Sequence, residues 1–176
     1  RASQMNAGAA ACPADVLLFL RAVPAKPGQF QIASVGGQRA WTADDEASVR
    51  RLAAEKADPR LADLALTGVG AAFRVEGTVP GEAETQIFLR TASGAPIALV
   101  VLSRPGAERQ VQVATGDVID EAAAPLRPGS LLWYHVACTL PPALPAEVGA
   151  ELGEAERAAV ADDYRFAVSS TPCDAG

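Results

Sequence analysis

Any nucleophilic active site in this chain would have to include His135, the single histidine of the sequence. A Ser-His-Asp triad or a Cys-His pair uses an imidazole as its general base. Cys138 follows three residues later, within an apolar and aromatic run that we predict to be a strand. Side chains alternate between the faces of a strand, so His135 and Cys138 would point in opposite directions. The sequence therefore predicts a packed histidine and no catalytic residues.

The residues that bind metals and cofactors do not occur in a recognisable spacing. The three cysteines match neither a zinc pattern nor a CxxC motif. Gly68-Val69-Gly70 precedes a predicted strand, whereas a dinucleotide fingerprint follows one. The acidic pair Asp162-Asp163 does not fit a calcium loop, and we interpret it as solvated surface. We expect no metal site and no cofactor.

The three thiols leave two redox states open. Cys12, Cys138 and Cys173 are either reduced and partly buried, or two of them form a disulfide and one is left over. If the chain matures outside the cytoplasm, we prefer Cys138 with Cys173. A predicted helix between them could bring the end of the chain back to Cys138, which would leave Cys12 free.

The segment Leu131–Cys138 has the densest aromatic content in the chain, and as a strand it would be apolar on both faces. We take Trp133, Tyr134 and His135, together with Trp41, as candidate contacts to a ligand or partner. The run Trp133-Tyr134-His135-Val136-Ala137 resembles a strand of laminin-G and related concanavalin-like sandwiches. That resemblance covers five residues and implies no functional residue here.

Composition excludes two classes of partner. The net charge is −6, with 15 basic against 21 acidic residues, so a nucleic-acid backbone would be repelled. No apolar run approaches the roughly 20 residues of a membrane-spanning helix. The sequence starts at Arg1 without a methionine. A removed signal or transit peptide would explain this and favours an extracytoplasmic or organellar site, whereas a chosen chain boundary would leave the compartment open.

The first part of the chain predicts a hairpin followed by helices. Val16–Leu20 and the alternating stretch Gln29–Val35 form the hairpin. Thr42 caps a helix that begins with three acidic residues and ends near Asp58. Pro59 is well suited to the first position of a second, short helix.

From Ala71 onward the hydrophobic period changes to two, which is typical of strands. Turns containing proline or glycine separate four predicted strands: residues 73–79, 85–91, 97–102 and 109–114. Ile97–Leu102 has no polar interruption and should lie centrally. After a long connection over 115–129 and the strand at 131–138, we expect a helix over 145–163 and a last strand over 164–168.

These elements predict an α+β fold, with an antiparallel meander sheet or partial barrel of five to seven strands and two or three short helices. We expect a tail over 1–14, one domain over 15–168 and a second tail over 169–176. The missing catalytic inventory favours a non-catalytic accessory or structural subunit that binds another protein in an assembly. A small-ligand or carbohydrate-binding β module is the alternative, and an enzyme ranks below both.

Overall fold

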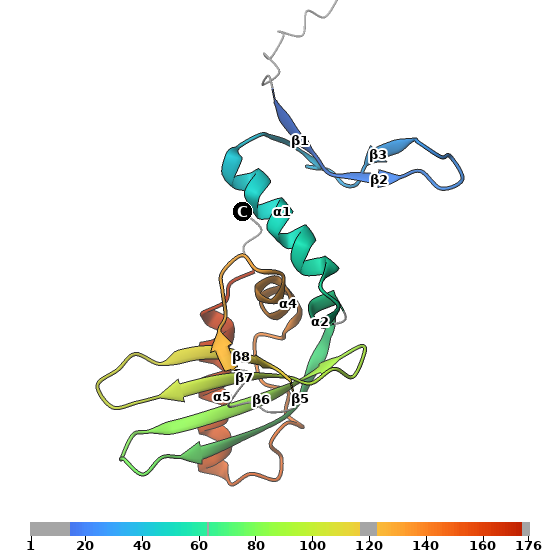
Figure 1. Ribbon diagram of the computed structural model, residues 1–176. Coiled ribbons are helices and arrows are strands. Elements are labelled where there is room, and N and C mark those ends of the chain that lie inside the picture. The colour runs from blue at the N-terminus through green and yellow to red at the C-terminus, as the bar shows by residue number, and fades with distance from the viewer. Residues whose placement is uncertain (1–14, 63, 117–122, 174–176) are drawn as a thin grey trace, which may run out of the picture. The chain divides into compact units, whose positions relative to one another are not determined.

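The computed structural model describes residues 15–62, 64–116 and 123–173 (Figure 1). They form an α+β fold with a five-stranded antiparallel meander, two small two-stranded sheets and packed helices, as the sequence predicts. The chain divides into two compact units, residues 1–50 and 51–176, and the boundary falls inside helix α1. Each unit is described by itself. The predicted tail over 1–14 lies outside the described residues, and the predicted single domain over 15–168 stays a prediction.

Unit 1 contains an interrupted antiparallel hairpin. Strand β1 (Val16–Leu18) pairs with β4 (Gln38–Ala40), and β2 (Leu20–Ala22) pairs with β3 (Phe30–Ile32). Residues 33–37 separate β3 from β4 on the second side of the hairpin. In this turn the Gly37 N–H donates to the Ser34 carbonyl at 2.9 Å. The predicted hairpin is therefore present, but glycines at 36 and 37 split it into two short ladders.

Helix α1 (Ala43–Ala57) begins where the sequence predicts, and its last residues belong to unit 2. The Thr42 hydroxyl accepts a hydrogen bond from the Asp45 N–H at 3.0 Å, which satisfies one of the free N–H groups of the first turn. Pro59 then starts α2 (Pro59–Ala62), a single turn. Both predicted helix starts are confirmed.

Unit 2 is built on an open sheet with the strand order β5-β6-β7-β8-β9. The strands are β5 (Leu66–Glu76), β6 (Ala83–Thr91), β7 (Ile97–Ser103), β8 (Gln110–Thr115) and β9 (Ala123–Pro125). The uninterrupted apolar strand β7 is central, as predicted, and Ile97 to Val101 are all buried. Strand β9 lies in the segment that the sequence analysis treated as a connection. It pairs with β8 over only three residues, too few to show a period of two.

Two predictions about the last third of the chain are wrong. Residues 131–138 lie in helix α4 (Leu131–Thr139), and the segment predicted as a last strand belongs to α5 (Glu154–Ser169). Buried residues recur at helical spacing in both places: Val136 and Leu140 along α4, and Val160, Tyr164 and Ala167 along α5. The short resemblance to a sandwich strand therefore has no structural counterpart, because those five residues are helical.

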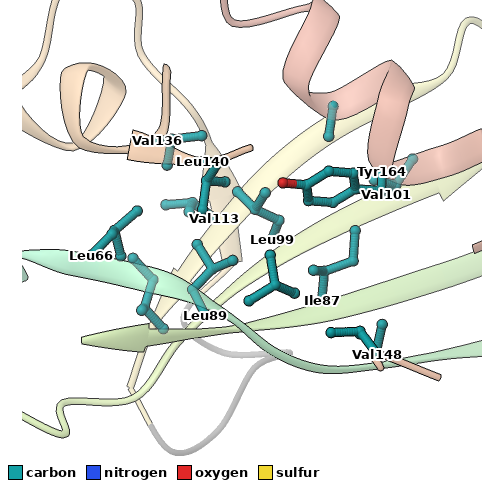
Figure 2. Packing of buried hydrophobic residues seen from close by; sticks show 14 of the residues in the cluster. Leu66, Ile87, Leu89, Leu99, Val101, Val113, Val136, Leu140, Val148 and Tyr164 are labelled. Carbon is teal, nitrogen blue, oxygen red and sulfur yellow. The ribbon is translucent and has the colours of Figure 1, made fainter. Parts of the chain in front are cut away.

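Helices α4 and α5 contribute to the same hydrophobic core on one face of the sheet (Figure 2). Ile87, Leu99 and Val101 of the sheet are completely buried, and so is Tyr164 of α5. The Tyr164 hydroxyl donates to the Pro141 carbonyl at 2.7 Å, which ties α5 to the segment after α4. Burial raises the pKa of Tyr164 to about 12.

This raised pKa makes stability depend on pH at the alkaline end. An unfolded tyrosine ionises near pH 10, so the unfolded state loses its proton before the folded state does. We expect the contribution of Tyr164 to be complete below pH 10 and to be lost as the pH rises from about 10 to about 12. Denaturant unfolding of the wild type and Tyr164→Phe across this range measures it. A stability difference between the two proteins that stays constant from pH 9 to 12 would contradict the prediction.

Candidate functional site

The β2–β3 ladder of unit 1 exposes an apolar surface, which we call the hairpin face and define as Leu20, Ala22, Phe30 and Ile32. Leu20 lies opposite Ile32 and Ala22 opposite Phe30, so the four side chains share one side of the ladder. Arg21 and Gln31 lie opposite each other on the other side. The exposed fractions are 48% for Leu20, 63% for Phe30 and 48% for Ile32. Large apolar side chains are rarely exposed together on so few residues.

The described residues of unit 1 do not form a hydrophobic core. Among its described residues, only Gly37 is buried. A Cβ atom at Gly37 would lie 2.7 Å from Cγ2 of Ile32, so a larger residue there would collide with the hairpin face. A two-stranded hairpin by itself is marginally stable in water. The hairpin therefore gains stability from any apolar surface that covers this face.

The charge of the hairpin is opposite in sign to that of the whole chain. Residues 15–41 contain Arg21, Lys26 and Arg39 against Asp15, a net charge of +2, whereas the complete chain carries −6. Trp41 follows the hairpin and is 43% exposed. Its indole N–H donates to Glu46 at 2.7 Å across the start of α1. Trp41 is thus held by its own unit and keeps an exposed ring.

The other three predicted contact residues lie on α4 in unit 2. Trp133 is partly buried against the core, whereas Tyr134 is exposed. Consecutive residues point about 100° apart on a helix, so the two rings do not form one platform. The sequence analysis expects a strand with two apolar faces at 131–138. These residues instead form helix α4, which packs on the core.

His135 is half-buried, and its predicted relation to Cys138 is wrong. Residues three apart on a helix lie on the same side, so the argument from opposite strand faces fails. Cys138 nevertheless supplies no thiolate, because its sulfur is bonded to Cys173. Burial and, to a smaller extent, the charge of Lys56 lower the pKa of His135, which leaves the imidazole neutral at pH 7.

The start of α4 is fixed by two contacts that sequence reasoning missed. The Ser130 hydroxyl accepts from the Trp133 N–H at 3.1 Å, and Glu55 of α1 accepts from the Leu131 N–H at 2.6 Å. Glu55 also forms an ion pair with Arg127. A serine directly before an apolar run is a helix-capping signal, and it could have identified α4 from the sequence.

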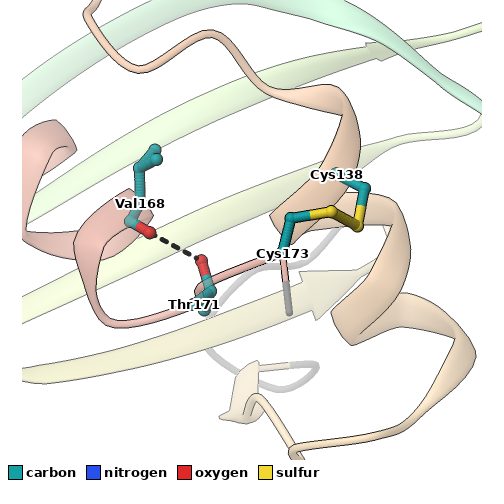
Figure 3. The surroundings of a disulfide bond; sticks show 4 residues. All are labelled: Cys138, Val168, Thr171 and Cys173. Carbon is teal, nitrogen blue, oxygen red and sulfur yellow. Dashed lines mark hydrogen bonds between the residues drawn. A yellow bond between two sulfur atoms is a disulfide. The ribbon is translucent and has the colours of Figure 1, made fainter. Parts of the chain in front are cut away.

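The disulfide joins Cys138 of α4 to Cys173, four residues beyond the end of α5 (Figure 3). These are the two cysteines that the sequence analysis preferred. Between α5 and the disulfide, the buried Thr171 donates to the Ala167 carbonyl at 3.1 Å. The segment after α5 is therefore attached at both ends: to α5 by Thr171 and to α4 by the disulfide.

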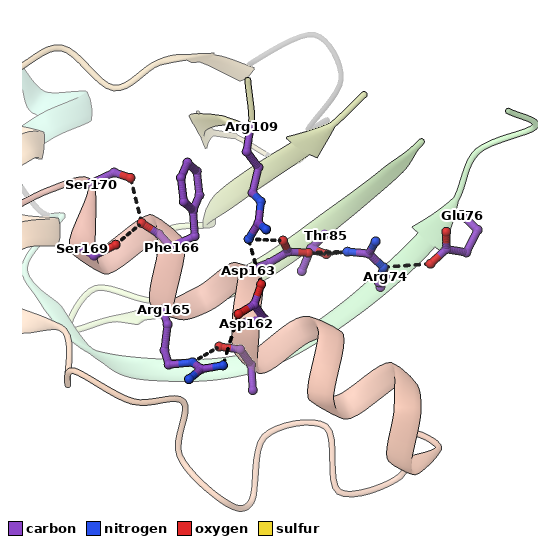
Figure 4. Close-up of polar contacts among 11 residues, drawn as sticks. Arg74, Glu76, Thr85, Arg109, Asp162, Asp163, Arg165, Phe166, Ser169 and Ser170 are labelled. Atoms are coloured by element: carbon purple, nitrogen blue, oxygen red, sulfur yellow. Dashed lines mark hydrogen bonds and ion pairs between the residues drawn. The ribbon is translucent and has the colours of Figure 1, made fainter. Parts of the chain in front are cut away.

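Asp163 is the centre of a buried polar network (Figure 4). Its carboxylate accepts from the Thr85 hydroxyl at 2.6 Å and lies 3.1 Å from Nη1 of Arg109. It also forms an ion pair with Arg74 of β5, and its side chain is only 4% exposed. The interpretation of Asp162-Asp163 as solvated surface is therefore wrong for Asp163. Sequence spacing gave no warning, because its partners Arg109, Thr85 and Arg74 are 54 to 89 residues away.

The two arginine partners of Asp163 each contact a second carboxylate. Arg74 also contacts Glu76 at 2.8 Å, and Arg109 contacts the exposed Asp162 at 3.0 Å. Burial opposes the charge of Arg74, but the hydrogen bond to Glu76 and the charge of Asp163 outweigh it and raise the Arg74 pKa. Asp163 thus anchors α5 to the sheet, and Glu76 and Asp162 pair with the same two arginines.

Within residues 15–62, 64–116 and 123–173, no cluster of histidine, cysteine and carboxylate groups is arranged to hold a metal ion. None of the helices in this part of the chain is long and apolar enough to cross a membrane. Comparisons of the chain with protein-family models, with curated proteins and with solved structures found no match. The function is therefore argued from the surfaces described above.

The disulfide leads to a prediction about thiols and stability. It closes a loop with a sequence separation of 35 residues, and loops of this size restrict the unfolded chain by about 3 to 4 kcal/mol. We expect Cys138→Ser/Cys173→Ser to lose stability of that order in denaturant titrations. Thiol titration of the oxidised protein, unfolded without reductant, should find one free thiol, that of Cys12. Three free thiols would contradict the pairing.

A second prediction separates the two adjacent aspartates. Asp163→Asn leaves two partly buried guanidinium groups with a weaker partner, and losing the buried carboxylate of such a network costs about 3 kcal/mol. Asp162→Asn removes an exposed ion pair and should cost no more than about 1 kcal/mol. Thermal and denaturant unfolding of both variants tests this. Equal losses for the two would show that the network does not anchor α5.

Proposed function

We propose that this chain is a non-catalytic accessory or structural subunit that binds another protein through the hairpin face. One observation carries the proposal: Leu20, Phe30 and Ile32 are about half exposed or more, in a unit whose described residues bury only a glycine. An apolar surface of this kind is typical of a protein-binding site, because covering it removes apolar area from water.

The physical reason is that binding a partner would stabilise the hairpin itself, in addition to forming the complex. Docking would supply the second layer that a two-stranded hairpin lacks. The net charge of +2 over residues 15–41 suits a partner whose surface is acidic. The network around Asp163 supports the same proposal indirectly, since its acidic groups are occupied in holding α5.

The test removes the apolar surface without disturbing a core. Phe30→Ser/Ile32→Ser changes two exposed side chains, so unit 2 should unfold as in the wild type. We expect the wild type to migrate above the mass of its own denatured chain in native extracts of its source, and the double variant to shift to that mass. Native mass measurement with an antibody to the chain gives both values.

A matched control is available in unit 2. Val75→Ser/Val79→Ser also replaces two exposed apolar side chains, 55% and 51% exposed, and should leave the assembly intact. If the wild type migrates as a monomer in source extracts, or if both double variants lose the assembly equally, the hairpin face is not the binding surface.

A further inference from the structure

A cavity of about 210 Å³ lies in unit 2 between α4, the end of α5 and the start of β8. It is independent of the hairpin face, because all of its lining residues belong to unit 2. They are Arg109, Val111, Leu126, Trp133, Phe166, Ser170 and Thr171. Trp133 is one of the residues that the sequence analysis singled out as a candidate contact, and here it forms part of a wall.

The size and walls of the cavity suit a single ring. Trp133 and Phe166 supply aromatic surface, and Val111 and Leu126 supply aliphatic surface. A cavity of about 150 Å³ lined by apolar side chains is large enough to hold benzene. The additional volume here would hold one small substituent on the ring. The disulfide keeps the walls together, because it connects the helix of Trp133 to the segment that carries Ser170 and Thr171.

Arg109 is the charged residue among those that line the cavity. Its guanidinium lies over the Phe166 ring, 4.8 Å from the ring centre, and Nη1 contacts Asp162 and Asp163 on one side. These contacts do not use Nε or Nη2, which together form the edge of a guanidinium that binds the two oxygens of a carboxylate. The cavity lining contains no carboxylate that could pair with a bound amine.

The two hydroxyl groups that line the cavity already donate hydrogen bonds to backbone carbonyls. Ser170 donates to the Phe166 carbonyl at 2.8 Å, and Thr171 donates to the Ala167 carbonyl at 3.1 Å. Among the lining side chains, Arg109 is the cationic donor, and it is suited to bind a negatively charged group of a ligand. We propose that the cavity binds a single-ring aromatic carboxylate, with its ring against Trp133 and Phe166 and its carboxylate on Nε and Nη2 of Arg109.

The fluorescence of Trp133 can report binding, because Trp133 lines the cavity. The chain has two tryptophans, so Trp41→Phe leaves Trp133 as the sole tryptophan. In this background we would titrate benzoate, benzyl alcohol and benzylamine and follow the fluorescence. For ligands of this size we expect a saturable response to benzoate with a Kd on the order of 1 mM. Benzyl alcohol should bind at least about five-fold more weakly, and benzylamine should give no saturable response.

Two serines that differ in one respect provide the matched control. Ser169 and Ser170 are both exposed and both donate to the Phe166 carbonyl, at 2.9 and 2.8 Å, but only Ser170 lines the cavity. We expect Ser170→Leu to weaken benzoate binding at least about ten-fold and Ser169→Leu to leave it unchanged. Arg109→Gln should abolish the preference for benzoate over benzyl alcohol.

The proposal is overturned by any of three results: no saturable response to benzoate, equal effects of the two serine variants, or benzylamine binding as tightly as benzoate. Because Arg109 also contacts Asp163, the Arg109 variant needs a check by thermal unfolding. The serine pair carries the test if that variant is unstable. None of these outcomes depends on whether the hairpin face binds a protein.

Discussion

The buried carboxylate of Asp163 connects helix α5 to strands β5 and β6 and to the residue before β8, and the architecture of unit 2 depends on this connection. Arg74 comes from β5 and Thr85 from β6, while Arg109 directly precedes β8. A buried charge is tolerated only when its partners are close and hydrogen-bonded. Because these partners come from distant parts of the chain, the network fixes the position of α5 on the sheet. Val160, Tyr164 and Ala167 of the same helix pack in the hydrophobic core.

The two units differ in how their apolar residues are used. Unit 2 buries the centre of its sheet under α4 and α5, and it leaves no buried side-chain nitrogen or oxygen without a partner among the described residues. Among the described residues of unit 1, the large apolar side chains Leu20, Phe30 and Ile32 are exposed. The hydrophobic effect that stabilises unit 2 internally would stabilise unit 1 if a partner covered these side chains. This contrast is why we place the protein-binding proposal on the hairpin and the ligand proposal on a cavity of the folded core.

Several polar and reactive side chains of unit 2 have a structural role. Asp163 and Glu55 accept hydrogen bonds that hold helices, Cys138 is in a disulfide, and His135 is half-buried and neutral at pH 7. Arg109 shares its guanidinium among an aromatic ring, two carboxylates and the edge of a cavity. Arg109 is held by its contacts on one edge of the guanidinium while the other edge makes no such contact with the described residues. Such a residue suits ligand recognition, since its orientation is already fixed before a ligand binds.

Local chemistry in the sequence determined the hairpin, the capped start of α1 and the strands from β5 to β8. In each case the cause acts within a few residues: alternation of apolar side chains, glycine or proline in turns, and the Thr42 hydroxyl on a nearby N–H. Tertiary structure decided the rest. Residues 131–138 are apolar enough for a strand or a helix, and the choice of helix depends on Val136 and Leu140 reaching a core built from distant strands. Asp163 lies next to the exposed Asp162, and it differs from Asp162 in its contacts with Arg74 and Thr85. The cavity beside Trp133 has the same origin, because its walls come from segments that folding alone brings together.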